Sequence, residues 1–267
     1  MKKIRYIFGA LCLCLLVFYT SLAMSAEGEE TGFDLDGPEM AGDAENASNP
    51  LAKANNTDLR WQYLDLEDDK GRVNDFFIDG AFMVHPKLKI KYELHYWETD
   101  ITGSSESDWE SMVWKGIFFP TQGIFSNGVK YRTAVGADLI WDFGNQDKGI
   151  GTGADQIGPF VGLALGLKGG TMLIPLVQQY WSYSGEDVNT TAFRLIALQP
   201  LPKQMWLKLD AKAPVDWEND EAVPASAELQ FGKNIDKLIS LYVDGLVGIG
   251  DDKIFDWGVG TGLRFKY

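Results

Sequence analysis

The sequence contains almost no cysteine. Its two cysteines, Cys12 and Cys14, both lie in an apolar run near the amino terminus. That run has the features of a secretory leader, so we expect the mature chain to contain no cysteine. Such a chain cannot form a disulfide, a thiolate metal site or a cysteine nucleophile. His85 and His95 are the only histidines, which excludes a histidine-cluster metal site. We predict no cofactor and no metal centre.

Positive charge and long apolar runs are also lacking. The chain carries 24 lysines and arginines against 38 acidic residues, a formal net charge of −14. Nucleic-acid binding needs a basic face, so we expect no nucleic-acid partner. Beyond the leader, no stretch is apolar enough for a transmembrane helix. A secreted chain of this kind can be periplasmic, extracellular or an outer-membrane barrel, whose alternating strands average to neutral hydropathy.

The first 57 residues predict two segments that precede the folded domain. Residues 1–25 combine a basic start, an apolar run over 7–18 and the small-x-small pattern of Ala23 and Ser25, which predicts a cleaved signal peptide. The alternative is an uncleaved membrane anchor. Residues 26–57 are acidic, rich in Gly, Ala and Asn, and without periodicity, which is typical of a flexible, disordered arm. The alternative is an arm tucked into the interior of a barrel.

Two-residue alternation dominates the remaining residues, 58–267. In 257–267, apolar side chains alternate with glycine, arginine and lysine up to the final Tyr267. A strand sends successive side chains to opposite faces, so this segment has one oily face and one small or polar face. A transmembrane barrel turns the oily face to lipid and the other to the lumen. The inner glycines predict open lumen along this wall, and the terminal aromatic strand resembles the signal read by the barrel-assembly machinery.

Similar segments recur along the domain and predict an all-β fold. We expect an antiparallel up-and-down transmembrane β-barrel of about twelve strands, an even number that suits a barrel with both termini on the periplasmic side. The predicted strands are centred near Trp61, Ile78, Tyr92, Val113, Val135, Leu163, Val177, Arg194, Leu207, Leu229, Leu241 and Thr261.

The connections between these strands divide by charge. The odd-numbered ones hold 18 acidic residues against four basic ones, whereas the even-numbered ones hold five lysines and the single acid Asp236. One rim is therefore predicted to be acidic with longer loops and the other mildly basic with shorter turns, as in outer-membrane barrels. Aromatic residues gather near both rims, as Trp97 and Tyr267 illustrate, which suits two membrane–water interfaces. A soluble sandwich would account for their number but not for their distribution.

The polar rows of the predicted strands carry the candidate binding residues. In a barrel they would line the lumen. The selected set is Lys89, Lys91, Glu93, His95, Arg132, Asp138, Arg194, Lys208, Asp210 and Arg264. Opposite charges among them can pair and plug a narrow lumen, or they can leave a polar path for a solute. Both interpretations stay open at this point.

The two histidines raise the question of catalysis. His95 is expected to point inward near Glu93, and His85 to lie in a solvated turn. Barrel lipases pair a serine with a histidine, and the stretch around Ser182 and Ser184 is only a faint likeness to their motifs. We therefore assign no catalytic residue and predict that the chain is not an enzyme. A serine hydroxyl within hydrogen-bond reach of either histidine would indicate a lipid hydrolase instead.

Several pieces of the second half carry a family resemblance. They are residues 177–185 (VQQYWSYSG), the turn 199–202 (QPLP), the stretch 215–217 (VDW) and the final strand. Residues 49–52 (NPLA), in the predicted arm, are similar too. On these pieces the chain resembles a family of bacterial outer-membrane transporters linked to phenol-type degradation pathways. The resemblance implies a barrel that admits small, aromatic or hydrophobic solutes, and it supplies no catalytic residues.

Together these observations predict an outer-membrane channel for passive uptake of a small solute. The main alternative is a structural or surface-interaction barrel with a plugged lumen, and an outer-membrane lipid hydrolase is the third. We expect as partners outer-membrane lipid and lipopolysaccharide, the barrel-assembly machinery and a small-molecule solute.

Overall fold

The structure, a computed structural model, describes residues 50–167 and 170–267. The predicted signal peptide and residues 26–49 of the predicted arm lie outside the described residues. The strands are β1 (Asn56–Leu66), β2 (Arg72–His85), β3 (Leu88–Thr99), β4 (Glu106–Phe118), β5 (Gln122–Ile124), β6 (Lys130–Asp142), β7 (Ala154–Gly166), β8 (Met172–Gly185), β9 (Asn189–Leu201), β10 (Met205–Asp216), β11 (Ala225–Asn234), β12 (Ile239–Ile249) and β13 (Phe255–Lys266). Two short 3-10 turns, η1 (Glu67–Asp69) and η2 (Gln146–Lys148), lie in loops.

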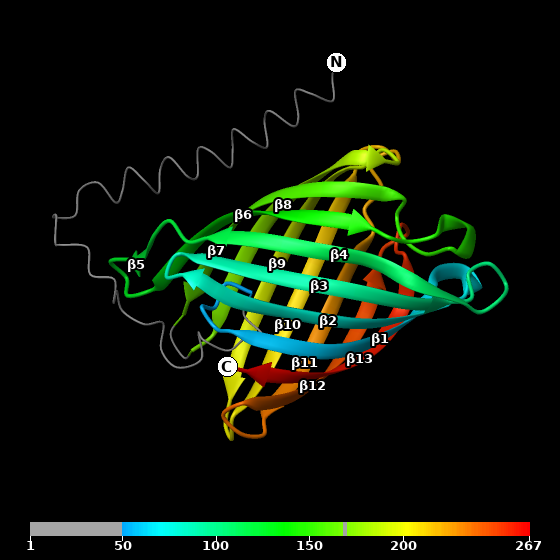
Figure 1. Cartoon of the computed structure of the whole chain (residues 1–267). Coiled ribbons are helices and arrows are strands. Elements are labelled where there is room, and N and C mark those ends of the chain that lie inside the picture. The colour runs from blue at the N-terminus through cyan, green and yellow to red at the C-terminus, as the bar shows by residue number, and fades with distance from the viewer. Residues whose placement is uncertain (1–49, 168–169) are drawn as a thin grey trace, which may run out of the picture. The chain divides into compact units, whose positions relative to one another are not determined.

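Twelve of these strands form a closed antiparallel barrel (Figure 1). Neighbours in sequence pair with each other, β1 pairs with β13, and β4 pairs with β6. Each of the twelve predicted centres falls in a different barrel strand, which confirms the predicted fold class. The first strand begins at Asn56, two residues before the predicted boundary at 58.

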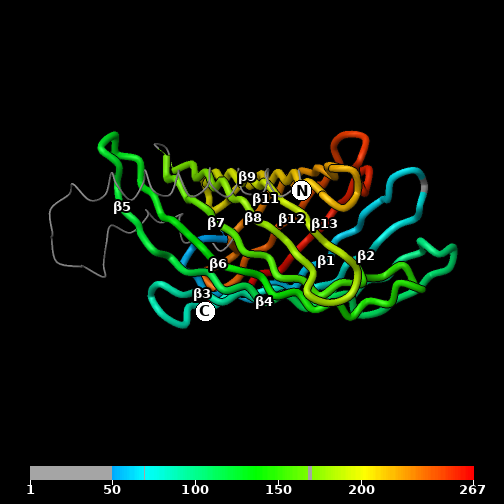
Figure 2. Tube along the Cα trace, turned by 90° about the horizontal axis from the view of Figure 1, so that it is seen from above, coloured from blue at the N-terminus to red at the C-terminus, as the bar shows by residue number. Residues whose placement is uncertain are grey.

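The short strand β5 was not predicted. It pairs with the start of β6, from Lys130 to Arg132, beyond the part of β6 that β4 covers. Figures 1 and 2 show β5 projecting at one end of the barrel. Three residues inside a long connection give too short an alternation to be recognised from sequence. This connection, 119–129, is also the exception to the expectation of short turns on its rim.

The outer face of the barrel is an apolar band. Large hydrophobic side chains remain exposed along the outward rows, including Leu59, Ile78, Leu209, Val243 and Val259. Such a surface is an aggregation hazard in water and is stable against lipid tails. Among the described residues, no helix is long and apolar enough to cross a membrane.

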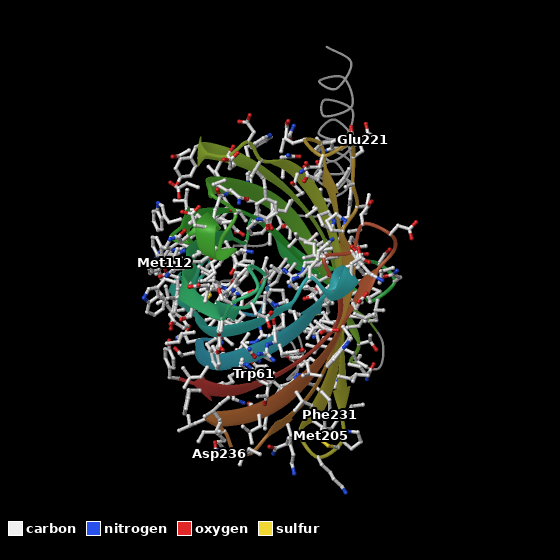
Figure 3. The ribbon with its side chains drawn as sticks, turned by 90° about the vertical axis from the view of Figure 1, so that its right-hand side faces the viewer. Trp61, Met112, Met205, Glu221, Phe231 and Asp236 are labelled. Atoms are coloured by element: carbon white, nitrogen blue, oxygen red, sulfur yellow. The ribbon has the colours of Figure 1, made fainter. Side chains whose placement is uncertain are left out.

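The up-and-down topology places all odd-numbered connections at one end of the barrel and all even-numbered ones at the other. Figure 3 shows Glu221 at one end and Asp236 at the other. The predicted acidic rim is thus a single end of the barrel, opposite the end where β1 begins and β13 finishes. Lys148 in the loop 143–153 donates a 2.8 Å hydrogen bond to Asp108, which raises the pKa of Lys148 and ties this loop to β4.

Candidate functional site

The lumen is the candidate site, and all ten selected residues face it. Lys89, Lys91, Glu93 and His95 are on β3, Arg132 and Asp138 on β6, Arg194 on β9, Lys208 and Asp210 on β10, and Arg264 on β13. They belong to the rows that point away from the lipid-facing side chains, because side chains alternate along each strand. The structure brings them into pairs and small clusters rather than into one group.

On the β9–β11 wall the charges pair between adjacent strands. Arg194 donates to Asp210 through two nitrogens, at 2.7 Å from Nε and 2.5 Å from Nη2. Lys208 lies 2.8 Å from Glu228 on β11. Such short, paired contacts between charged groups are stronger than neutral hydrogen bonds. They hold neighbouring strands together from the inside.

The opposite wall, β2 to β6, has a similar arrangement. His95 lies inward as predicted, with Nδ1 2.8 Å from Asp75 and Nε2 3.7 Å from Glu93. Lys115 on β4 lies 3.1 Å from Asp138 on β6. The contacts of His95 with Asp75 and of Lys115 with Asp138 also run along the wall, from one strand to its neighbour.

The barrel seam is closed by a buried ion pair. Arg264 on β13 donates to Asp58 on β1, at 2.8 Å from Nε and 2.6 Å from Nη2. Asp58 also accepts hydrogen bonds from the Tyr242 hydroxyl and the Asn56 amide, both at 2.7 Å. The last strand is therefore fixed to the first by a fully satisfied polar network.

The expectation that the inner glycines of β13 mark open lumen is wrong. A Cβ at Gly262 would lie 2.2 Å from the Tyr242 ring, and one at Gly258 would lie 2.7 Å from Leu64. Glycine is required there because larger neighbours pack directly on its backbone. These positions are filled wall, and the sequence could not show this because the covering side chains come from other strands.

Part of the lumen, towards the end where β1 begins, is filled by apolar side chains, which the polar-row analysis missed. A buried cluster occupies it: Leu51, Ile117, Phe119, Ala134, Phe160, Ala164, Met172, Ile174, Leu176, Ile196, Leu198, Trp206 and Tyr242. In β8 and β9 both faces carry apolar side chains, so alternation alone does not tell lumen from lipid there. The available signal was the weak alternation of 171–184.

Residues 50–55, which precede β1, enter the barrel at this cluster through Leu51. Leu51 and Ala52 are 1% and 0% exposed. Lys89 donates to the Ala52 carbonyl at 2.7 Å and to the Pro50 carbonyl at 3.4 Å, and Arg132 donates to the Leu51 carbonyl at 2.9 Å. This described end of the predicted arm is therefore tucked into the barrel, which was the alternative considered from sequence. We call residues 50–55 the inner segment.

Some charged side chains inside the barrel keep access to solvent. The side chains of Glu93 and Arg194 are 30% and 27% exposed, and Lys212, next to Arg194 across β9 and β10, is exposed as well. All three lie on lumen-facing rows, so their exposure is exposure to the lumen.

Neither histidine makes a hydrogen bond to a serine hydroxyl in the described part of the chain. His95 contacts Asp75 and Glu93, and His85 accepts a 3.2 Å hydrogen bond from the Lys87 amide. The hydroxyl of Ser182 accepts from the Val188 amide at 3.0 Å. The geometry that would have indicated a lipid hydrolase is not formed by these residues.

No family model and no curated protein sequence matches the chain. Solved structures do match it. An outer-membrane channel from Pseudomonas putida F1 has 7% identity and a TM-score of 0.60, covering 80% of this chain and 96% of that one. The fold is that of porin-like barrels of the bacterial outer membrane. The NanC porin has 10% identity and a TM-score of 0.59 over 79% of this chain and all (100%) of its own. The KdgM porin has 8% identity, a TM-score of 0.54 and coverages of 79% and 99%.

Proposed function

We propose that this barrel is a channel for passive uptake of a small solute, and that the inner segment closes it towards the end where β1 begins. The observation that carries the proposal is the direction of the ion pairs. The pairs of Arg194, Lys208, Lys115, His95 and Arg264 each join neighbouring strands along the wall. They leave charged groups exposed to the lumen between the walls, which suits a polar path.

The rival function is a structural barrel with a plugged lumen. One observation favours it, because Arg60 on β1 reaches Asp244 on β12 at 3.1 Å and Glu228 on β11 at 3.9 Å. These contacts cross β13, which lies between β1 and β12, and they narrow the lumen near the seam. The Arg60 contacts do not connect β3, which carries Glu93, to β9, which carries Arg194.

The proposed solute is small and has an aromatic or hydrophobic part. Two things support this: the apolar cluster in the lumen and the resemblance to outer-membrane transporters linked to phenol-type degradation pathways. The KdgM porin has been solved in complex with disordered oligogalacturonate, so a porin-like barrel of related fold accommodates a solute. Outer-membrane lipid, lipopolysaccharide and the barrel-assembly machinery are the other partners that we propose, from the apolar band and the terminal strand.

Planar-bilayer conductance tests this proposal. The full chain and a variant without residues 27–54, which leaves β1 intact, are refolded and reconstituted separately. The channel proposal expects ion conductance that rises when the inner segment is removed. A barrel that stays silent in both forms is the structural barrel instead.

A further inference from the structure

Two buried cations hold three consecutive backbone carbonyls of the inner segment. Lys89 and Arg132 are 1% and 7% exposed. Lys89 donates hydrogen bonds to the carbonyls of Pro50 and Ala52, and Arg132 donates one to the carbonyl of Leu51, which lies between them. The two side chains come from β3 and β6, which are separated by β4, so they hold the segment from two places on the wall.

The charge around Lys89 is not balanced by these contacts. Within the described ranges, no carboxylate lies at ion-pair distance from Lys89, and its hydrogen bonds are to neutral carbonyls. Arg132 bonds the neutral carbonyl between the two that Lys89 bonds, so two cations meet one stretch of neutral backbone. Burying a cation without an anion is costly, so an anionic oxygen would be a better partner for Lys89 than a carbonyl.

Beside these cations, the Leu51 side chain occupies an apolar pocket. It belongs to the buried cluster with Phe119, Phe160 and Leu176. Leu51 Cδ1 lies 3.6 Å from the place that a Cβ on Gly162 would take, so bare backbone forms part of the pocket wall. The inner segment thus presents oxygen atoms to two cations and one apolar group to a pocket.

We propose that Lys89, Arg132 and the Leu51 pocket form a binding site for a small apolar monocarboxylate, which the inner segment occupies in the closed barrel. A carboxylate takes the place of the backbone carbonyls on Lys89 and Arg132, and its apolar body takes the place of the Leu51 side chain. Solute and segment compete for the same site, so the solute releases the segment. This inference rests on the proposed channel function and adds a solute class and a way of opening.

Thiol labelling of a single introduced cysteine tests the competition. Ala52→Cys is made in the full chain with Cys12→Ser and Cys14→Ser, so that a water-soluble maleimide reports release of the inner segment. The probe is sodium benzoate, compared with benzamide, sodium acetate and inorganic phosphate. We expect labelling to accelerate saturably with benzoate, and to respond at least about tenfold more weakly to the neutral amide, which lacks the charge-assisted bonds. Acetate and phosphate lack the apolar body and leave the rate unchanged.

Variants separate the binding site from a general loosening of the barrel. Lys89→Gln should raise basal labelling and remove the benzoate response, whereas Lys89→Arg should keep the response. Lys203→Gln removes a lysine from the exposed turn between β9 and β10, at the barrel end where β1 begins. It should label like the Ala52→Cys chain without further substitution. The folding of each variant is checked by the heat-dependent gel shift of folded barrels. A labelling rate that does not change with benzoate, or that rises equally with benzamide, overturns the inference.

The two proposals fail in different ways. Conductance of the variant without residues 27–54 together with benzoate-insensitive labelling would overturn the carboxylate site and keep the channel. A benzoate response without conductance in that deletion variant would overturn the channel and show that the site binds its ligand in a closed barrel.

Discussion

Asp58, near the start of the first barrel strand, accepts a 2.6 Å hydrogen bond from Arg264, three residues from the end of the chain. Both side chains are almost fully buried, with 0% and 7% exposure. The interaction joins two residues that are 206 positions apart in sequence and closes the barrel from inside. It holds the first and last strands together at the β1–β13 seam.

Removing one partner of this pair should destabilise the barrel strongly. Arg264→Met leaves the Asp58 carboxylate buried with only its neutral donors, Asn56 and Tyr242. We expect a loss of about 3–5 kcal/mol in the free energy of unfolding, measured by urea titration in lipid vesicles. Lys148→Met, which breaks the exposed pair with Asp108, is the matched control and should change stability far less. Equal losses in the two variants would contradict the role of the seam.

The glycine row of β13 supplies a second prediction. Gly262→Ala places a methyl group against the Tyr242 ring, which cannot move away because its hydroxyl is bonded to Asp58. We expect a destabilisation of about 1–3 kcal/mol from overpacking. Gly116→Ala, at a glycine with open space around its Cβ position, should be close to neutral. Tyr242→Ala combined with Gly262→Ala should cost less than the sum of the two, since the clash is gone; strict additivity would argue against this packing.

Leu51 should act as the anchor of the inner segment. Leu51→Ala removes buried apolar contacts from the closed state and should weaken docking by about 2–5 kcal/mol, the range for such truncations in packed cores. The closed state loses free energy relative to both the open and the unfolded state, so the open fraction rises and the free energy of unfolding falls by no more than the lost docking free energy. Single-channel recording checks this as a longer open time. Leu59→Ala, on the lipid face, should leave channel gating unchanged.

Lumen charge should set ion selectivity. Lys212 is exposed on a lumen-facing row beside Arg194. Lys212→Glu should therefore shift the reversal potential in a salt gradient towards cation selectivity. Lys203→Glu makes the same charge change on an exposed turn and should shift it little. An unchanged reversal potential for Lys212→Glu would mean that ions do not pass this wall.

The strands and their inward rows follow from the sequence because alternation is a local property. Lys89, Glu93 and Arg132 could be assigned to the lumen from their own strands alone. What fills the lumen could not be predicted in this way. The ring over Gly262 comes from β12, and the side chains around Leu51 come from several strands. The partners of Asp58 and Lys89 are likewise decided by which strands face each other after closure.

The inner segment illustrates the same limit. Residues 50–55 have no alternation and few charges, so composition grouped them with the acidic arm. Their place in the barrel depends on Lys89 and Arg132, whose cationic ends meet three carbonyls that any sequence would provide. The sequence alone could offer this placement only as an alternative.

The most direct test of the account is the conductance of single barrels with and without residues 27–54. The account predicts rare, brief openings for the full chain and a sustained ohmic conductance for the variant, because removing the inner segment frees the lumen towards the end where β1 begins. The absence of conductance from both folded barrels would contradict it. In that case the lumen would stay closed without the inner segment, so the inner segment would not be what closes it.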